Sequence, residues 1–329
     1  MIDRRALLGV LGAGAVSATA PIRANPASGA GAAETDALWS RRVGWIELWS
    51  GGAPGMPTDP PTELVKRRPG TEILEITGVS RPRLMVIRPR QSNGSAALVI
   101  PGGGYTRLIA GTEGPEIARW LAARGWTVFV LLYRLPDDGW SRRADVPLQD
   151  AQRAIRLIRS RAGALGFRPD RVAAFGSSAG GHLCCDLATR FAVSVYSAVD
   201  AADRLSARPD FAAAAYPVQT MAEPHVHRGS RARLLGADPP LDLVRAHSPE
   251  NNVRPDCPPF LLMHAENDPT VGPENSLRMR SALKAAGVRV ETHLFPDGGH
   301  GFGIAGVANT TTAAWPELLA RAAKSYGLG

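Results

Sequence analysis

Ser178 is the residue of this chain that is best placed to act as a nucleophile. It stands at the centre of residues 176–180 (GSSAG), which fit the pattern G-x-S-x-G. An apolar run ends just before this segment, and a helical pattern begins near Ala179. Between a strand and a helix, the pattern forms a sharp turn that lifts a serine hydroxyl above a sheet. The flanking glycines suit the strained turn because they have no Cβ.

A nucleophilic serine needs a histidine that takes its proton and a carboxylate that orients the histidine. In one known arrangement the order along the chain is Ser, then Asp or Glu, then His. His300 is flanked by glycines in a loop after the last predicted strand, which can present an imidazole. Asp268 and Glu266 both follow the preceding strand. We favour Asp268 because Pro269 fixes a turn beside it, and Glu266 remains the alternative.

A glycine-rich segment, residues 101–105 (PGGGY), follows the third predicted strand. Acyl transfer needs backbone N–H donors aimed at the oxygen that becomes negative, and glycines let the backbone approach that oxygen. We predict that the N–H groups of Gly103, Gly104 and Ala179 form this oxyanion hole. A phosphate-binding loop is disfavoured because no Gly-Lys-Ser or Gly-Lys-Thr follows. Tyr105 is expected to line the acyl pocket and bind substrate, although core packing suits it equally well.

Alternating strands and helices are predicted to position these residues. Eight strand-like runs cover residues 71–77, 83–88, 96–100, 127–133, 171–175, 211–216, 260–264 and 289–295, and the first two are expected to form a hairpin. Helical patterns cover residues 115–124, 148–162, 179–190, 274–286 and 313–325. Several strands are continuous apolar runs, which are typical of a parallel sheet that is buried on both faces.

This order of elements predicts an α/β fold with an eight-stranded, mostly parallel sheet and helices on both faces. Reactive groups in such sheets lie at the carboxyl ends of the strands. The long connections at residues 199–210 and 218–255 are expected to cover the site as a small lid.

Composition restricts the class of protein. The length of 329 residues suits one large domain, and the 44% hydrophobic and 21% charged fractions are typical of globular proteins. The net charge of +8 comes from scattered arginines without an aromatic-rich basic stripe, which argues against a nucleic-acid partner. Three cysteines make no disulfide framework, and their spacing to the histidines does not suit zinc.

The N-terminus has the layout of a targeting segment. Residues 1–24 place Arg4 and Arg5 before a short apolar run and small residues, which indicates a cleaved signal peptide that resembles a twin-arginine signal. An ordinary secretory signal and an uncleaved anchor are the alternatives. We expect residues 25–70 to be a flexible leader and surface extension, and residues 71–329 to be the catalytic domain. The mature protein is expected to be periplasmic or secreted and to make no membrane contact.

With these residues in place, the chain resembles α/β-hydrolase esterases related to acetylxylan esterases. The resemblance covers most of residues 45–305 and rests on several stretches: residues 49–56 (WSGGAPGM), 101–105 (PGGGY), 133–136 (YRLP), 150–156 (DAQRAIR), 176–183 (GSSAGGHL), 216–218 (YPV), 234–236 (LLG), 273–276 (PENS) and 298–303 (GGHGFG). It implies that Asp268 is the catalytic acid. The chain departs from the family at Ser177, where a larger residue is common, and at Asn267, where an Asp is common.

These observations lead us to expect a serine esterase that cleaves short acyl esters through an acyl-enzyme on Ser178. The resemblance implies that the substrate is a small ester or an acetylated plant-wall carbohydrate such as acetylated xylan, and that no metal or organic cofactor is needed. The alternatives are a peptidase of the same fold and a non-enzymatic, hydrolase-like wall-binding protein. Such peptidases usually carry an additional propeller domain, and non-enzymatic relatives usually lose a triad residue. The sequence carries no information on the oligomeric state.

Overall fold

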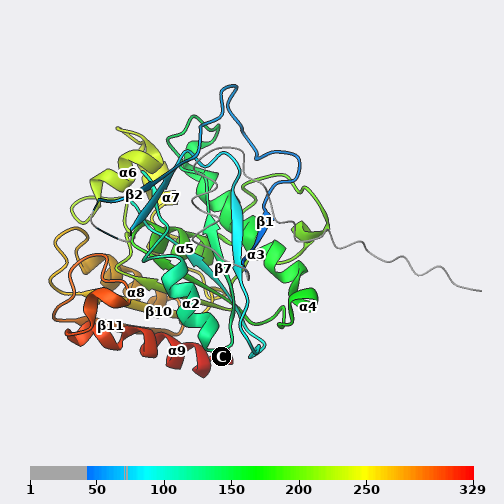
Figure 1. Cartoon of the computed structure of the whole chain (residues 1–329). Helices are drawn as coiled ribbons and strands as arrows, with labels where there is room; N and C mark the ends of the chain where they lie inside the picture. The colour runs from blue at the N-terminus through cyan, green and yellow to red at the C-terminus, as the bar shows by residue number, and fades with distance from the viewer. Residues whose placement is uncertain (1–42, 70, 72) are drawn as a thin grey trace, which may run out of the picture.

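The computed structural model describes residues 43–329 except residues 70 and 72 (Figure 1). Its central sheet has eight strands in the order β1-β4-β7-β5-β8-β9-β10-β11. The strands are β1 (Val43–Glu47), β4 (Arg83–Ile87), β5 (Ala96–Ile100), β7 (Thr127–Leu132), β8 (Val172–Ser177), β9 (Phe211–Ala215), β10 (Phe260–Ala265) and β11 (Val290–Phe295). β4 runs antiparallel to both of its neighbours, and the pairings from β7 to β11 are parallel. The predicted signal peptide, residues 1–24, lies outside the described residues.

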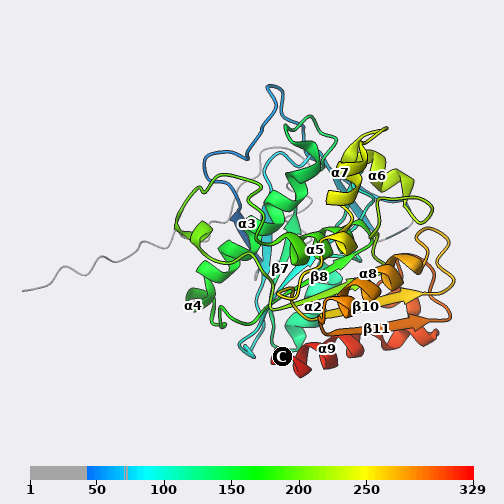
Figure 2. The ribbon, with the colours of Figure 1, turned by 180° about the vertical axis from the view of Figure 1, so that it is seen from behind.

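Helices cover both faces of the sheet, so the predicted fold class is confirmed (Figures 1 and 2). α2 (Pro115–Ala123) and α9 (Trp315–Ser325) lie on one face, and α3 (Val146–Ser160), α5 (Ala179–Arg190) and α8 (Glu274–Ala285) lie on the other. Within the described part of the chain, no helix is both long and apolar enough to cross a membrane.

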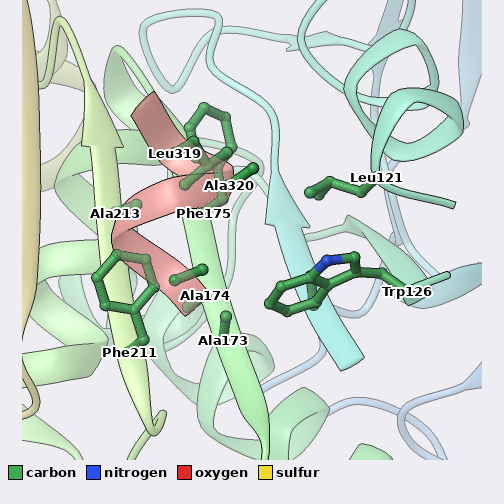
Figure 3. Close-up of a pocket in the computed structure, with 11 residues that line it drawn as sticks. Leu121, Trp126, Ala173, Ala174, Phe175, Phe211, Ala213, Leu319 and Ala320 are labelled. Atoms are coloured by element: carbon green, nitrogen blue, oxygen red, sulfur yellow. The ribbon is translucent and has the colours of Figure 1, made fainter. Parts of the chain in front are cut away.

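The layer between α2, α9 and the sheet is apolar, as Figure 3 shows. Leu121, Trp126, Phe175, Phe211 and Leu319 pack around a small cavity of about 20 Å³. Only carbon-rich side chains and one indole surround it, so this cavity is a packing gap and offers no group for catalysis. The chemistry must take place at the carboxyl edge of the sheet instead.

The predicted hairpin of the first two strands is wrong. β3 (Leu74–Thr77) does not pair with β4 but forms a second, three-stranded sheet with β2 (Leu64–Arg67) and β6 (Leu108–Ile109). The chain turns at Gly78, where φ is +64° and a Cβ would collide with the Thr62 carbonyl, so the link leads from one sheet to the other. In the large sheet, β1 instead of β3 pairs with β4. The sheet therefore begins upstream of residue 71, the predicted start of the catalytic domain.

A buried ion pair ties β1's neighbouring segment to the core. Arg134 and Asp150 are both inaccessible to solvent and join through Nη2 and Oδ1 at 2.8 Å. Asp150 also accepts a hydrogen bond from the indole N–H of Trp49 at 2.7 Å. All three residues belong to stretches that carry the family resemblance, and their role here is structural.

Candidate active site

Ser178 occupies the strained turn between β8 and α5. Its φ of 53° and ψ of −120° are unusual for a residue with a side chain, and its N–H donates to the Ala215 carbonyl at 3.1 Å. Glycine is required on both sides because a Cβ at Gly176 would collide with the Gly180 carbonyl, and one at Gly180 would collide with the Ile100 carbonyl. The turn places Ser178 at the N-terminus of α5, where the helix dipole favours a developing negative charge.

Ser178, His300 and Asp268 form a chain of hydrogen bonds at the carboxyl edge of the sheet. Ser178 Oγ lies 2.9 Å from His300 Nε2, and His300 Nδ1 lies 2.7 Å from Asp268 Oδ2. The other carboxylate oxygen, Oδ1, accepts from the backbone N–H groups of Thr270 and Val271 at 2.8 and 2.9 Å. The turn after β10 therefore fixes the carboxylate while the loop after β11 presents the imidazole.

This arrangement determines the tautomer of His300. An ionised carboxylate can only accept hydrogen bonds, so His300 Nδ1 must carry a proton and donate it to Asp268. Nε2 is then free to accept the proton of the Ser178 hydroxyl. A histidine in this state can act as a general base towards the serine.

The carboxylate of Asp268 stays ionised because its donors outweigh its burial. Burial alone would raise its pKa, but His264, His300 and the Val271 N–H hold the pKa well below the ordinary value. His264 Nε2 lies 3.4 Å from Asp268 Oδ2. Glu266, the alternative acid, is exposed, and its backbone N–H pairs with β11 at the Phe295 carbonyl. The structure thus brings Asp268, and not Glu266, to the histidine.

The glycine loop lies beside the serine. A Cβ at Gly102 would come within 2.9 Å of Ser178 Cβ, so the loop and the nucleophile are in close contact. Among the described residues, the N–H groups of Gly103 and Gly104 have no hydrogen-bond acceptor. Ala179 opens α5, and its N–H therefore lacks a partner within the helix. These are the groups from which the sequence predicts an oxyanion hole.

Tyr105 does not line the cleft as predicted. Its side chain is 1% exposed and is absent from the residues that line the cleft at Ser178. Its hydroxyl lies 2.7 Å from His182 Nδ1, while His182 Nε2 lies 2.8 Å from the His247 carbonyl. Since that carbonyl must accept from Nε2–H, the Tyr105 hydroxyl donates to Nδ1. Tyr105 is therefore packed in the core and bonded to α5 through His182, which is the packing alternative.

An open cleft of about 440 Å³ leads to Ser178 and His300. Its wall combines apolar surface, to which Ile73 and Ile109 contribute, with the polar side chains of Arg68, Thr106, Arg107, Thr112, Glu113, His227 and Thr270. His227 lies at the start of α6 (Arg228–Leu235), in the second of the two connections expected to form a lid. The first connection, residues 199–210, instead packs against α3, where Arg153 binds Asp200 and Asp203.

His227 presents a neutral imidazole to the cleft. Its Nδ1 accepts from the Ser230 backbone N–H at 3.2 Å, so the ring proton is on Nε2. Burial and then the nearby His300 lower its pKa. Among the described residues Nε2 has no partner, so it can donate a hydrogen bond to a molecule in the cleft.

Sequence reasoning missed three residues of this site. Glu113, Tyr216 and His227 lie at or next to the cleft, but none of them belongs to a chemical motif. The tyrosine stands in a stretch shared with the family, residues 216–218, which was the one available signal.

Comparison with known proteins identifies the family and the fold. Residues 85–283 match the BD-FAE family. The structure is similar to an acetyl ester-xyloside bifunctional hydrolase from Caldicellulosiruptor lactoaceticus, with 34% identity and a TM-score of 0.72 over 87% of this chain and 97% of that one. Esterase 2 of Thermogutta terrifontis is 26% identical, with a TM-score of 0.61 over 82% of this chain and 97% of that one.

Curated relatives are longer proteins. An acetylxylan esterase of Xylanibacter ruminicola is 30% identical over 235 residues, which are 70% of this chain and 46% of that protein. An endo-1,4-beta-xylanase B of Butyrivibrio fibrisolvens is 34% identical over 63% of this chain and 32% of that protein. The chain thus spans half or less of the length of these two relatives.

Proposed function

The chain belongs to the BD-FAE family of α/β-hydrolase esterases, and from this premise we propose that it is a serine esterase that hydrolyses short acyl esters, chiefly acetyl esters of plant-wall carbohydrates. The observation that carries the proposal is the hydrogen-bonded series Ser178, His300 and Asp268, whose serine and histidine line an open cleft with polar and charged side chains in its wall. A serine that borders an open cleft and is hydrogen-bonded to a histidine base is what acyl transfer requires.

In the first half of the reaction, Ser178 Oγ attacks the carbonyl carbon of the ester while His300 Nε2 takes the hydroxyl proton. The carbonyl oxygen becomes negative and binds the N–H groups of Gly103, Gly104 and Ala179. Asp268 stabilises the imidazolium. The C–O bond to the alcohol then breaks, and the alcohol oxygen takes the proton from His300 as it leaves.

Water completes the cycle. It attacks the acyl-enzyme while His300 Nε2 takes one of its protons, and a second oxyanion forms at the same N–H donors. The bond to Ser178 Oγ breaks, the serine recovers its proton from His300, and the free carboxylic acid leaves.

The character of the cleft supports a carbohydrate alcohol. Threonine, arginine and histidine side chains line it, and these can donate or accept hydrogen bonds with sugar hydroxyls. A long acyl chain would need an apolar channel instead. The names of the relatives, an acetylxylan esterase and an acetyl ester-xyloside hydrolase, point to the same class of substrate.

A substrate panel tests the proposal. Initial rates are measured on acetyl, butyryl and octanoyl aryl esters, on acetylated xylan and acetylated pectin, and on a set of peptides, with Ser178→Ala as the control. We expect the acetyl ester to be cleaved faster than the octanoyl ester and acetylated xylan to release acetate. An octanoyl preference would indicate a lipase, and cleavage of peptides alone would indicate a peptidase.

A further inference from the structure

Glu113 is a buried carboxyl group at the cleft, next to the oxyanion loop but outside the proposed triad. It lies just before α2, its side chain is 5% exposed, and it lines the same cleft as Ser178. No lysine or arginine in the described part of the chain forms an ion pair with it. A carboxyl group in such a place loses hydration without a compensating cation, so its presence there requires an explanation.

One oxygen of Glu113 holds the oxyanion loop. Oε2 accepts the backbone N–H of Gly102 at 2.8 Å. Gly102 directly precedes Gly103 and Gly104, whose N–H groups are the proposed oxyanion donors. A Cβ on Gly102 would lie 2.6 Å from Glu113 Oε2, so the carboxyl group is packed tightly against this part of the loop.

The other oxygen reaches the wall beside the base. Oε1 accepts the hydroxyl proton of Tyr216 at 3.2 Å. The Tyr216 ring packs edge-on against the imidazole of His300, with ring centroids 5.0 Å apart. Tyr216 itself has a φ of 39°, a left-handed conformation that a tyrosine seldom adopts. Glu113 therefore joins the segment that carries the oxyanion donors to the side chain that packs on the base.

The groups that surround Glu113 influence its ionisation, and His300 of the proposed triad is one of them. Burial raises the pKa of Glu113, while the Gly102 N–H, His300 and the Tyr216 hydroxyl act in the opposite direction. His300 is thus a positively ionisable group that interacts with this carboxyl, and it becomes charged during the proposed reaction.

We propose that Glu113 is a positioning residue of the active site, which acts through Gly102 to aim the oxyanion donors and through Tyr216 to hold His300. This inference rests on the proposed esterase function. Removal of one oxyanion donor typically lowers kcat by about 10²–10³-fold, and a misplacement of about 1 Å has costs near 10²-fold. A carboxyl that aims two donors therefore has an effect that kinetics can measure.

The test compares four variants with the wild-type enzyme on an aryl acetate. Glu113→Ala removes both hydrogen bonds, and we expect kcat to fall about 10²-fold while KM stays within threefold. Glu113→Gln keeps an oxygen for the Gly102 N–H and should restore kcat to within about tenfold of wild type. Glu113→Asp keeps a buried carboxyl but withdraws it by one methylene, and should lose at least tenfold in kcat. Glu116→Gln is the matched control, because Glu116 lies outside the cleft and accepts from the Ala305 N–H.

Inhibition by phenylboronic acid separates positioning from mere stability. The boronate adds to a catalytic serine as a tetrahedral adduct that mimics the transition state, so its Ki should rise in parallel with the loss in kcat/KM for Glu113→Ala. Thermal unfolding identifies folded variants, and Glu113→Asp decides the question if Glu113→Ala does not fold. A folded Glu113→Ala or Glu113→Asp with kcat within threefold of wild type overturns the inference, and so does an unchanged Ki. A wild-type enzyme that does not cleave the aryl acetate refutes the proposed function instead.

Discussion

Replacement of Asp268 by asparagine alters one polar atom of the proposed triad and should abolish nearly all turnover. Oδ1 of Asp268 accepts two backbone N–H groups, from Thr270 and Val271. In the variant only the amide oxygen can accept them, so the amide NH₂ must take the place of Oδ2. It then faces His300 Nδ1 as a donor. The imidazole must present an unprotonated Nδ1 to it and carry its proton on Nε2.

That tautomer is the wrong one for catalysis. With a proton on Nε2, His300 cannot accept the hydroxyl proton of Ser178, and the imidazolium also loses its counter-charge. In the serine-protease case of this substitution kcat falls by about 10⁴-fold. At about 1.36 kcal/mol for each factor of ten, this corresponds to about 5.4 kcal/mol of transition-state stabilisation. Because the backbone donors at Oδ1 allow only one orientation of the amide, we expect a loss of the same order here.

The measurement is kcat on an aryl acetate near pH 7.5 for the wild type, Asp268→Asn and Glu266→Gln. The glutamine variant is the matched control, since Glu266 lies in the same turn but is exposed, and it should lose less than about tenfold. Near-UV circular dichroism verifies that the variants are folded. An asparagine variant that keeps a tenth of wild-type kcat, or a larger loss for Glu266→Gln, would refute the tautomer argument.

The lowered pKa of Asp268 makes a second prediction from the same variant. Burial alone would raise this pKa, and the donors His264, His300 and Val271 lower it below the ordinary value of about 3.9. A carboxylate with a lowered folded-state pKa contributes stability that is present above the unfolded-state pKa and is lost as the pH falls through the folded-state pKa. The difference in unfolding free energy between wild type and Asp268→Asn should therefore be constant from about pH 5 to 8 and shrink below about pH 4. Urea unfolding at a series of pH values measures it, and a difference that grows on acidification would contradict this sign.

Three further predictions concern other parts of the chain. Ser178→Ala and His300→Ala should each remove nearly all turnover, and the double variant should lose little more than either one, because triad residues act as a unit; strictly additive losses in kcat would be inconsistent with this. Asp150→Asn should lower the free energy of unfolding by about 3–5 kcal/mol in urea, because it leaves the Arg134 charge buried without its partner, and a change below about 1 kcal/mol would exclude that role. Protein from the native host should begin between about residues 21 and 35 by mass spectrometry, since the leader reads as a cleaved signal; an intact Met1 on soluble enzyme would refute export.

Local motifs made much of the site predictable from the sequence. The turn at Ser178 needs small neighbours within two residues, so its signature is contained in five consecutive positions. The position of Asp268 was likewise inferred from its own turn, in which its carboxylate caps two N–H groups just ahead in the chain. Each inference used residues that are neighbours both in the sequence and in the structure.

Predictions failed where the decisive partner was distant in the sequence. The apolar runs at 71–77 and 83–88 looked like a hairpin because a short link joins them, but β3 pairs with β2 and β6 instead. Tyr105 follows the glycine loop and was therefore expected to line a pocket, but its hydroxyl is hydrogen-bonded to His182, which lies 77 residues away in the sequence. Neither pairing has a local signature, because sheet register and buried hydrogen bonds depend on the packing of the whole domain.

The contacts of Glu113 with Gly102 and Tyr216 depend on the fold, and no short sequence motif predicts them. The loop after β5 closes on itself, because Ile109 N–H donates to the Gly102 carbonyl at 3.0 Å and Thr106 N–H donates to the Gly103 carbonyl at 3.1 Å. Because the loop closes in this way, the chain comes back towards Ser178. The carboxyl group of Glu113, eleven residues after Gly102, can then accept a hydrogen bond from the Gly102 N–H. The same carboxyl meets Tyr216 only because β9 ends beside β8 in the parallel sheet, which brings its last residues next to the nucleophile. The absence of a side chain at Gly102 lets the buried acid approach its N–H closely, since a Cβ there would lie 2.6 Å from Glu113 Oε2. In the mechanism that we propose, the glycines that follow also leave space for an oxyanion.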